Sequence, residues 1–171
     1  MHYFLLGPSG VGKTTFANWL EANREYLHIA VDRGDDPSAL ITKGLIEQWV
    51  KLRNGDPAPF ASELQKRAET AGKKGCVLTF WSVIFYPPDG VELLATHNIA
   101  VRYLYGPKRK CIEAFVDREN RPERDETFWS SVNLHYENMG GPELVAYRAD
   151  VIKPSGERLN GQEIAELLKI D

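Results

Sequence analysis

The opening stretch "HYFLLGPSGVGKTTFANWL", residues 2–20, decides the fold class, because it has the pattern of a buried strand, a glycine-rich turn and a helix. The apolar run at 3–6 ends directly at a glycine, which is typical of a short buried strand. From Lys13 onward, apolar residues recur at helical spacing. A strand that passes through a tight turn into a helix is the beginning of an α/β unit.

The central segment "GPSGVGKTT" has the pattern of a phosphate-binding turn. Gly7, Gly12, Lys13 and Thr14 match the spacing G-x-x-x-x-G-K-[ST], which arises by chance in roughly one chain in two hundred of this length. Glycines let the backbone curl until its N–H groups point at phosphate oxygens, and the positive end of the following helix adds to the attraction. We expect Lys13 to neutralise the β- and γ-phosphates and the Thr14 hydroxyl to bind Mg²⁺. The residues expected to contact the nucleotide are Gly7, Ser9, Gly10, Val11, Gly12, Lys13, Thr14 and Thr15.

Composition narrows the class of protein. A chain of 171 residues, with 43% hydrophobic and 26% charged residues, suits one globular domain with its own core. The net charge of −3 does not favour binding to nucleic acid. Cys76 and Cys111 are far apart in apolar surroundings and are expected to be reduced core residues. No signal peptide opens the sequence and no run approaches the ~18 apolar residues of a membrane span, so we expect a cytoplasmic protein.

The rest of the chain alternates between apolar runs and helical patterns. Further strands are expected at 27–31, 76–81, 99–105 and 146–152. Further helices are expected from 37 to about 52, from about 61 to 73, from the turn at 86–90 to about 96, from 107 to about 118, from about 126 to 139, and at 161–169. Strands divided by helices predict a three-layer α/β fold in one domain, 1–171, with a mainly parallel five-stranded sheet covered by helices on both faces.

Other nucleotide-binding proteins carry signatures that this sequence lacks or misplaces. GTP-dependent switches carry D-x-x-G and N-K-x-D segments, and neither string occurs here. Large ATPases carry an apolar strand that ends in adjacent acids, whereas "DETF" at 125–128 follows the charged segment "NRPER". The remaining class among these is a compact kinase.

In size, in the N-terminal position of "GPSGVGKTT" and in the order of its elements, the chain resembles the small P-loop kinases. These include shikimate kinase, gluconate kinase and the nucleoside-monophosphate kinases. The resemblance covers nearly the whole chain, although only the phosphate loop is a highly specific motif. It implies a kinase that uses ATP and Mg²⁺. It also implies that helices within 37–75 hold the phosphate acceptor, that 118–126 is an arginine-rich lid, and that the adenine lies near the lid and "KPSGE" at 153–157.

Asp32 follows the strand expected at 27–31, at the edge of the sheet where open α/β folds bind ligands. The resemblance to shikimate and gluconate kinases implies an aspartate here, near Mg²⁺ and the acceptor hydroxyl. Asp32 would orient that hydroxyl, accept its proton or hold a water of the metal. Orientation is the simplest role, because phosphoryl transfer depends on positioning and charge more than on a base. A solvated or helix-capping acid is the alternative, and Asp35 is a second acceptor candidate.

The segment "RENRPERDE" at 118–126 supplies the arginines of the expected lid. A guanidinium binds two phosphate oxygens in a fork, and a closing lid excludes the water that would otherwise hydrolyse the nucleotide. Arg118 and Arg121 are the candidates for catalytic contacts, ahead of Arg124. The alternative is a solvated loop in which the acids neutralise the arginines.

The segment "TFWSVIFYPP" at 79–88 departs from the kinase pattern. Shikimate kinase has a glycine-rich acceptor segment after its third strand, and bulky residues take that place here, which argues against shikimate. Aromatic residues hint at a flatter acceptor such as a base, although large aromatics belong more often to the core. Ser82 is a candidate hydrogen-bond partner of the acceptor, and Arg33 and Arg53 are candidates for an anionic group on it.

No acid follows the third strand in "VLTFWS" at 77–82. This absence leaves a second function open, a nucleotide-binding or regulatory ATPase without a small-molecule acceptor. Phosphorylation of nucleic-acid ends is a third, which the net charge disfavours. The histidines, at 2, 28, 97 and 135, lack ligand spacing, so no zinc site is expected. The expected partners are therefore ATP and a small acceptor, without a membrane or nucleic acid.

Overall fold

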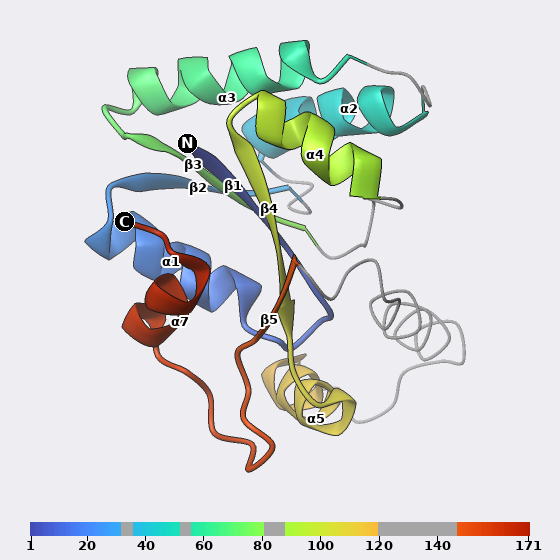
Figure 1. Ribbon diagram of the computed structural model, residues 1–171, viewed down its shortest axis with the longest axis vertical. Helices are drawn as coiled ribbons and strands as arrows, with labels where there is room; N and C mark the ends of the chain where they lie inside the picture. The colour runs from blue at the N-terminus through green and yellow to red at the C-terminus, as the bar shows by residue number, and fades with distance from the viewer. Residues whose placement is uncertain (32–35, 52–55, 81–87, 120–146) are drawn as a thin grey trace.

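The computed structural model describes residues 1–31, 36–51, 56–80, 88–119 and 147–171 (Figure 1). Strands and helices alternate along these residues, as the sequence predicts. The strands are β1 (His2–Leu6), β2 (Tyr26–Ala30), β3 (Gly75–Thr79), β4 (Ile99–Tyr105) and β5 (Arg148–Asp150). The helices are α1 (Lys13–Asn23), α2 (Pro37–Lys51), α3 (Ala58–Thr70), α4 (Pro88–Thr96), α5 (Lys108–Glu119) and α7 (Gly161–Leu168). The helix expected at 126–139 lies outside the described residues.

The described strands form one sheet in the order β2-β3-β1-β4-β5, and each neighbouring pair is parallel. The first strand of the chain is thus the central one: Phe4 lies opposite Leu78 on one side and Val101 on the other. Because all the strands run the same way, their carboxyl ends meet at one edge of the sheet. The turn after β1 begins at this edge.

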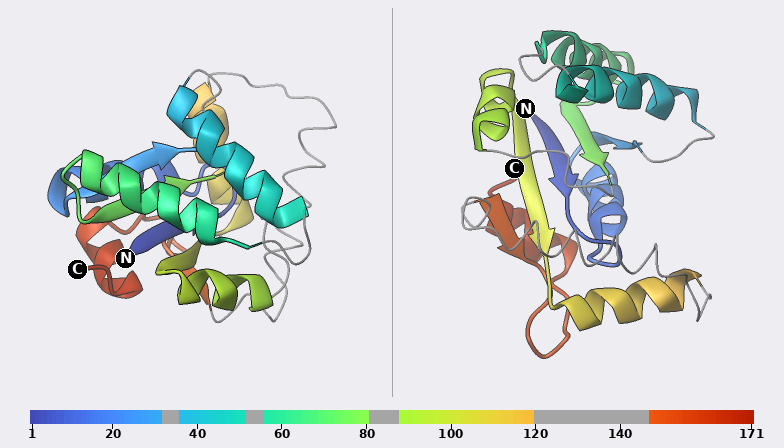
Figure 2. Two further views of the ribbon diagram at one scale, coloured as in Figure 1. Left: turned by 90° about the horizontal axis from the view of Figure 1, so that it is seen from above. Right: turned by 90° about the vertical axis from the view of Figure 1, so that its right-hand side faces the viewer.

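Helices cover both faces of the sheet (Figures 1 and 2). Buried residues of α2, α3 and α4 pack with Phe4 and Leu6 on one face. Buried residues of α1, α5 and α7 pack with Tyr3 and Leu5 on the other. Successive residues of β1 therefore enter opposite cores, which explains why its sequence is a continuous apolar run. The predicted three-layer α/β fold with a parallel five-stranded sheet is confirmed.

The start of α3 differs from the sequence expectation. The helix begins at Ala58, before the start that was expected at about residue 61. Pro57 precedes it and Pro59 lies in its first turn, where the missing N–H groups have no helical partner to lose. The Asp56 carboxylate accepts a hydrogen bond from the Ala58 N–H at 2.8 Å, which satisfies one of the N–H groups that have no partner within the helix.

β5 is shorter than the strand expected at 146–152, since it spans Arg148–Asp150. The Val151 N–H still donates a hydrogen bond to the Tyr105 carbonyl of β4 at 2.9 Å, and Ile152 forms an isolated antiparallel bridge with Arg158. Both side chains are buried, at 2% exposure each, so their apolar character reflects packing in the core. Similarly, β3 ends at Thr79 rather than at 81, although Phe80 is also buried.

Both cysteines are buried and neither forms a disulfide, as expected. Burial raises the pKa of the Cys76 thiol to about 11, so this side chain is a neutral core group at physiological pH. Within the described ranges, no helix has the length and apolar character that crossing a bilayer requires.

His2 is a buried polar residue at the start of β1, with 3% of its surface exposed. Its Nδ1 accepts a hydrogen bond from the Cys76 N–H of β3 at 3.0 Å. Burial lowers the pKa of His2, the positive N-terminus lowers it further, and a hydrogen bond with Gln65 partly opposes both. The folded protein therefore holds this imidazole neutral, since protonating Nδ1 would remove the acceptor that the Cys76 N–H needs.

Lowering the pH from 7 to 5 is expected to destabilise the protein through His2. Because the pKa of His2 is lowered in the folded state, the unfolded chain binds more protons than the folded protein once the pH falls below the ordinary pKa of about 6.5. The free energy of unfolding therefore decreases as the pH falls, by at most about 1.4 kcal/mol per pH unit. His2→Asn keeps an acceptor near the Nδ1 position and does not titrate. Urea unfolding at pH 5 to 8 measures the effect: the wild type should lose more stability than His2→Asn, and parallel losses would contradict this role.

Candidate nucleotide-binding site

The turn between β1 and α1 has the backbone of a phosphate cradle. Gly7, Gly10 and Gly12 have φ values of 146°, 79° and 104°, which residues with a β-carbon rarely adopt. Gly12 is the N-cap of α1, and no side chain caps this helix end. The first N–H groups of α1 therefore remain available for an anion at the positive end of the helix.

Lys13 folds back along the turn that precedes it. Its Nζ donates hydrogen bonds to the Gly7 carbonyl at 2.7 Å and to the Pro8 carbonyl at 3.0 Å. The side chain is half-buried, so the ammonium is held beside the cradle rather than in bulk water. A phosphate in the cradle would lie within the field of this charge.

A small cavity of about 70 Å³ opens beside the cradle. It is lined by Ser9, Gly10, Gly12, Lys13, Thr14, Thr15, Thr79, Phe80 and Arg118. Three elements thus meet here: the head of α1, the end of β3 and the last turn of α5. Hydroxyl groups and two cations surround the space, which suits phosphate and magnesium better than an apolar group.

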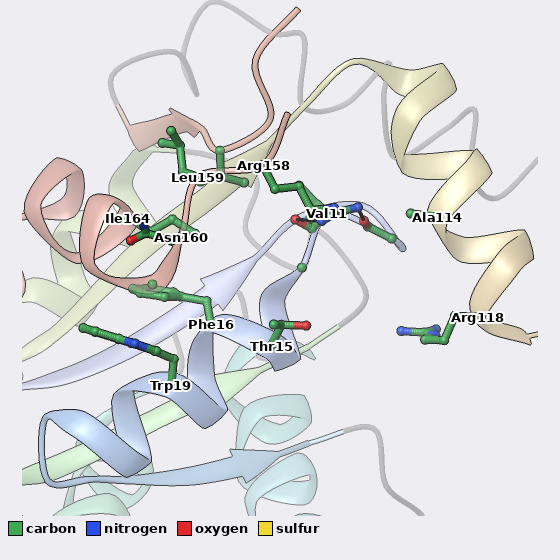
Figure 3. A pocket seen from close by; sticks show the side chains of 14 residues that line it. Val11, Thr15, Phe16, Trp19, Ala114, Arg118, Arg158, Leu159, Asn160 and Ile164 are labelled. Atoms are coloured by element: carbon green, nitrogen blue, oxygen red, sulfur yellow. Dashed lines mark hydrogen bonds between the residues drawn. The ribbon is translucent and has the colours of Figure 1, made fainter. Parts of the chain in front are cut away.

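A larger cavity of about 340 Å³ also borders the cradle (Figure 3). Its apolar wall includes Phe16 and Trp19 of α1, whose rings are stacked with centroids 6.2 Å apart and planes 13° apart. Gly161, at the start of α7, lies so close to Trp19 that a β-carbon there would be 2.3 Å from the indole. The large cavity is therefore a partly apolar slot that shares the cradle with the small cavity, as a site for a base and its phosphates requires.

Arg158, which follows β5, joins the last loop of the fold to the cradle. Its guanidinium donates hydrogen bonds to the carbonyls of Val11, at 3.0 Å, and Gly10, at 2.5 Å. The loop is anchored in turn at Asn160, which forms a reciprocal capping box with Glu163 of α7. Arg158 thus positions one wall of the large cavity and ties down two carbonyls of the phosphate turn.

Comparison with known proteins supports the fold. No protein-family profile and no curated protein sequence matches the chain. A shikimate kinase from Acinetobacter baumannii, solved with shikimate, is similar in structure at 20% identity and a TM-score of 0.57, over 98% of this chain and 92% of that one. A gluconokinase from Sinorhizobium meliloti is similar at 15% identity and 0.55, over 98% and 89%. The tunicamycin resistance protein of Deinococcus radiodurans is similar at 16% and 0.53, over 98% and 92%.

The fold is the three-layer P-loop fold that these shikimate kinase and gluconokinase structures also have. Sequence identities of 15–20% establish the shared fold only, so the reaction depends on the residues of the site.

Within this P-loop fold, the structure brings together the predicted phosphate-binding residues and Arg118. Arg118 lies in the last turn of α5 and lines both cavities, with its guanidinium carbon 5.1 Å from the centroid of the Phe115 ring (Figure 3). The other candidates lie outside the described residues, and their roles stay predictions: Asp32, Arg33, Asp35, Arg53, Ser82 and Arg121.

Sequence reasoning missed two groups at the site. It did not single out Arg158, Leu159, Asn160 and Gly161, which line the large cavity and directly follow the segment 153–157 expected near the adenine. It also treated Thr79 only as part of a strand, although this residue lines the small cavity. A cation after the last strand was the available signal for Arg158. For Thr79 there was none beyond its place at the carboxyl end of β3.

The residues of the small cavity fit a magnesium ion that arrives with a nucleotide. Mg²⁺ prefers oxygen ligands and is commonly bound by few protein groups together with substrate phosphates. The cavity offers the hydroxyl groups of Thr14 and Thr79. In the part of the chain that the structure describes, no group of three or more His, Cys, Asp or Glu residues could hold a metal by itself. The expected ligand is therefore the Thr14 hydroxyl, with phosphate oxygens completing the set.

Proposed function

We propose that the protein is an ATP- and Mg²⁺-dependent kinase that transfers the γ-phosphoryl group to a hydroxyl of a small metabolite or nucleotide. The proposal is carried by two cavities that share the cradle. Lys13 and the N-terminus of α1 line the small cavity, and the partly apolar large cavity has residues of the same turn in its wall. The fold shared with shikimate kinase and gluconokinase structures supports it.

In the proposed reaction, the acceptor oxygen forms a bond to the γ-phosphorus while the bond from that phosphorus to the bridging β–γ oxygen breaks. ADP leaves with the electron pair of that bond, and the proton of the acceptor hydroxyl passes to a base or to water. Lys13 and the α1 amides would stabilise the charge of the phosphates, which is the main contribution proteins make to this reaction. Bound Mg²⁺ would supply further charge neutralisation.

Arg118 would add a second cation to the phosphate site, since it lines the small cavity together with Lys13. Its side chain is exposed at the end of α5, and Arg118 is the first residue of the segment 118–126 that is proposed as the lid. To reach a phosphate, the guanidinium would exchange its contact with the Phe115 ring for a charge-assisted hydrogen bond. Asp32 is proposed to orient the acceptor hydroxyl, and Arg33, Asp35, Arg53 and Ser82 to bind the acceptor. The region 37–75 is proposed as the acceptor-binding part.

The second candidate is a nucleotide-binding or regulatory ATPase with no small-molecule acceptor. The observation in its favour is that β3 ends in Thr79, a neutral residue, rather than in an acid. Such a protein would use the same cradle and the same slot for the base. It would differ only in showing no dependence on an acceptor.

An acceptor screen separates the two functions. The protein is incubated with ATP and Mg²⁺ and with one compound at a time from a panel of hydroxy acids, sugars, nucleosides, nucleotides and tunicamycin. A kinase should form ADP well above its basal rate with one chemical class, and phosphorus NMR should show a new phosphate ester. A basal rate that no compound changes would favour the regulatory ATPase.

A further inference from the structure

Three polar side chains from three elements form a continuous hydrogen-bonded chain behind the small cavity. Asn18 of α1 lies with its Oδ1 2.7 Å from the Nδ1 of His28 in β2. The Nε2 of the same imidazole lies 3.0 Å from the Oγ1 of Thr79 in β3. The backbone N–H of His28 also donates a hydrogen bond to the Glu21 carboxylate at 3.0 Å, which links His28 to α1 a second time.

The chemistry of the partners fixes the direction of these hydrogen bonds. An amide oxygen only accepts, so the Nδ1 of His28 carries the hydrogen that is shared with Asn18. In the neutral imidazole the Nε2 is then an acceptor, and the Thr79 hydroxyl donates to it. The hydrogen of Thr79 is thus directed toward His28, and its oxygen lone pairs remain for a donor from elsewhere.

Thr79 is placed to use those lone pairs in the nucleotide site. It is the last residue of β3 and only 2% of its surface is exposed, yet it lines the small cavity together with Lys13 and Thr14. Its backbone is held as well, because its carbonyl accepts a hydrogen bond from the Val31 N–H at 3.0 Å. In many P-loop proteins an acid supports Mg²⁺ beside the phosphates. Here a neutral hydroxyl lines the cavity that we assign to them.

We propose that Asn18 and His28 are positioning residues that hold the Thr79 hydroxyl toward the magnesium–phosphate end of a bound nucleotide, where its oxygen accepts a hydrogen bond from the hydration shell of the ion. This inference rests on the proposed nucleotide-binding function and adds the group that supports the metal. A fixed hydroxyl needs no reorganisation when the ligand arrives, which is the advantage of a preorganised polar site.

The test compares Thr79→Val with Thr79→Ser by calorimetric titration of ADP, with Mg²⁺ and with the ion removed by chelation. Valine keeps the shape and loses the hydroxyl, whereas serine keeps the hydroxyl. Thr79→Val should lose about tenfold of the affinity that Mg²⁺ adds, the usual worth of one hydrogen bond, with little change in the metal-free affinity. Thr79→Ser should stay close to the wild type. Melting temperatures of both variants check that each is folded.

The positioning role of His28 is tested in the same titrations. His28→Ala should reduce the gain from Mg²⁺ by about threefold, since the hydroxyl of Thr79 is then present but free to rotate. His28→Gln, whose amide can place an acceptor near the Nε2 position, should restore most of the gain. A purely structural histidine would lower the melting temperature without this pattern.

The outcomes separate this inference from the function on which it rests. A wild type that bound no nucleotide would overturn both. A wild type whose affinity rises with Mg²⁺, together with a folded Thr79→Val that shows the same rise, would overturn the role of Thr79 alone. A loss in Thr79→Val with no loss in His28→Ala would overturn the positioning role of His28.

Discussion

Replacing Lys13 with methionine is expected to lower nucleotide turnover by about 100-fold or more, the effect of removing one charge-stabilising donor from a preorganised site. The Lys13 ammonium is held 2.7 Å from the Gly7 carbonyl and 3.0 Å from the Pro8 carbonyl, beside the cradle. Methionine keeps the length and the apolar stem of the side chain and removes the charge. The measurement is the rate of ADP formation at saturating ATP and Mg²⁺, with the affinity for ADP measured by calorimetry.

Lys73→Met is the matched control for this variant. Lys73 lies in the turn that precedes β3, at the edge of the sheet away from the cradle, so the same loss of charge should leave turnover close to the wild type. Turnover of Lys13→Met within about threefold of the wild type, a difference of less than 1 kcal/mol, would show that the cradle does not act on the phosphates as proposed.

Gly10→Ala is expected to destabilise the protein by several kcal/mol and to abolish nucleotide binding. A β-carbon at Gly10 would lie 1.9 Å from the Cys111 carbonyl oxygen of α5, and its φ is 79°. Left-handed strain and an overpacked contact each cost about 1–3 kcal/mol, and here the obstacle is backbone that cannot rotate away. To relieve this clash, α5 would have to move away from the turn, and Arg118 would move with it. Urea unfolding gives the free energy, and titration with ADP gives the affinity.

Gly44→Ala supplies the control within the same molecule. Gly44 lies inside α2, and a β-carbon there would meet nothing within 4 Å. Alanine should therefore stabilise the helix by about 0.5–1 kcal/mol, since it restricts the unfolded chain without a new contact. A Gly10→Ala variant as stable as Gly44→Ala would mean that α5 does not pack on the turn as described.

Local patterns predicted the elements that depend on local forces. The run at 3–6 is apolar because β1 is central and buried on both faces, and the glycines after it mark the turn. Errors arose at the ends of strands, where burial continues past the last residue of the strand. Val151, Ile152 and Phe80 are apolar because they pack in the core, so the predicted strands extended past the observed ends of β5 and β3.

The candidate site likewise has a part that local sequence predicts and a part that it does not. The glycine-rich turn is contiguous in sequence, so its spacing was enough to predict the backbone geometry of a cradle and the position of Lys13 beside it. His28 and Thr79 are 51 residues apart, and Arg158 is 147 residues from Val11. No periodicity links such pairs, because only the parallel pairing of β2 with β3, and the passage of the chain from β5 past the turn, bring them together.

The sequence by itself determined the α/β class, the glycine-rich turn that we propose binds a nucleotide, and the Lys13 charge beside it, because each depends on residues within a few positions of one another. The tertiary structure alone decided the order of the strands, the slot beside Trp19, the contact between Arg158 and the turn, and the placing of the Thr79 hydroxyl. The physical reason is that hydrogen bonds and packing act over a few ångströms in space, whatever the distance along the chain.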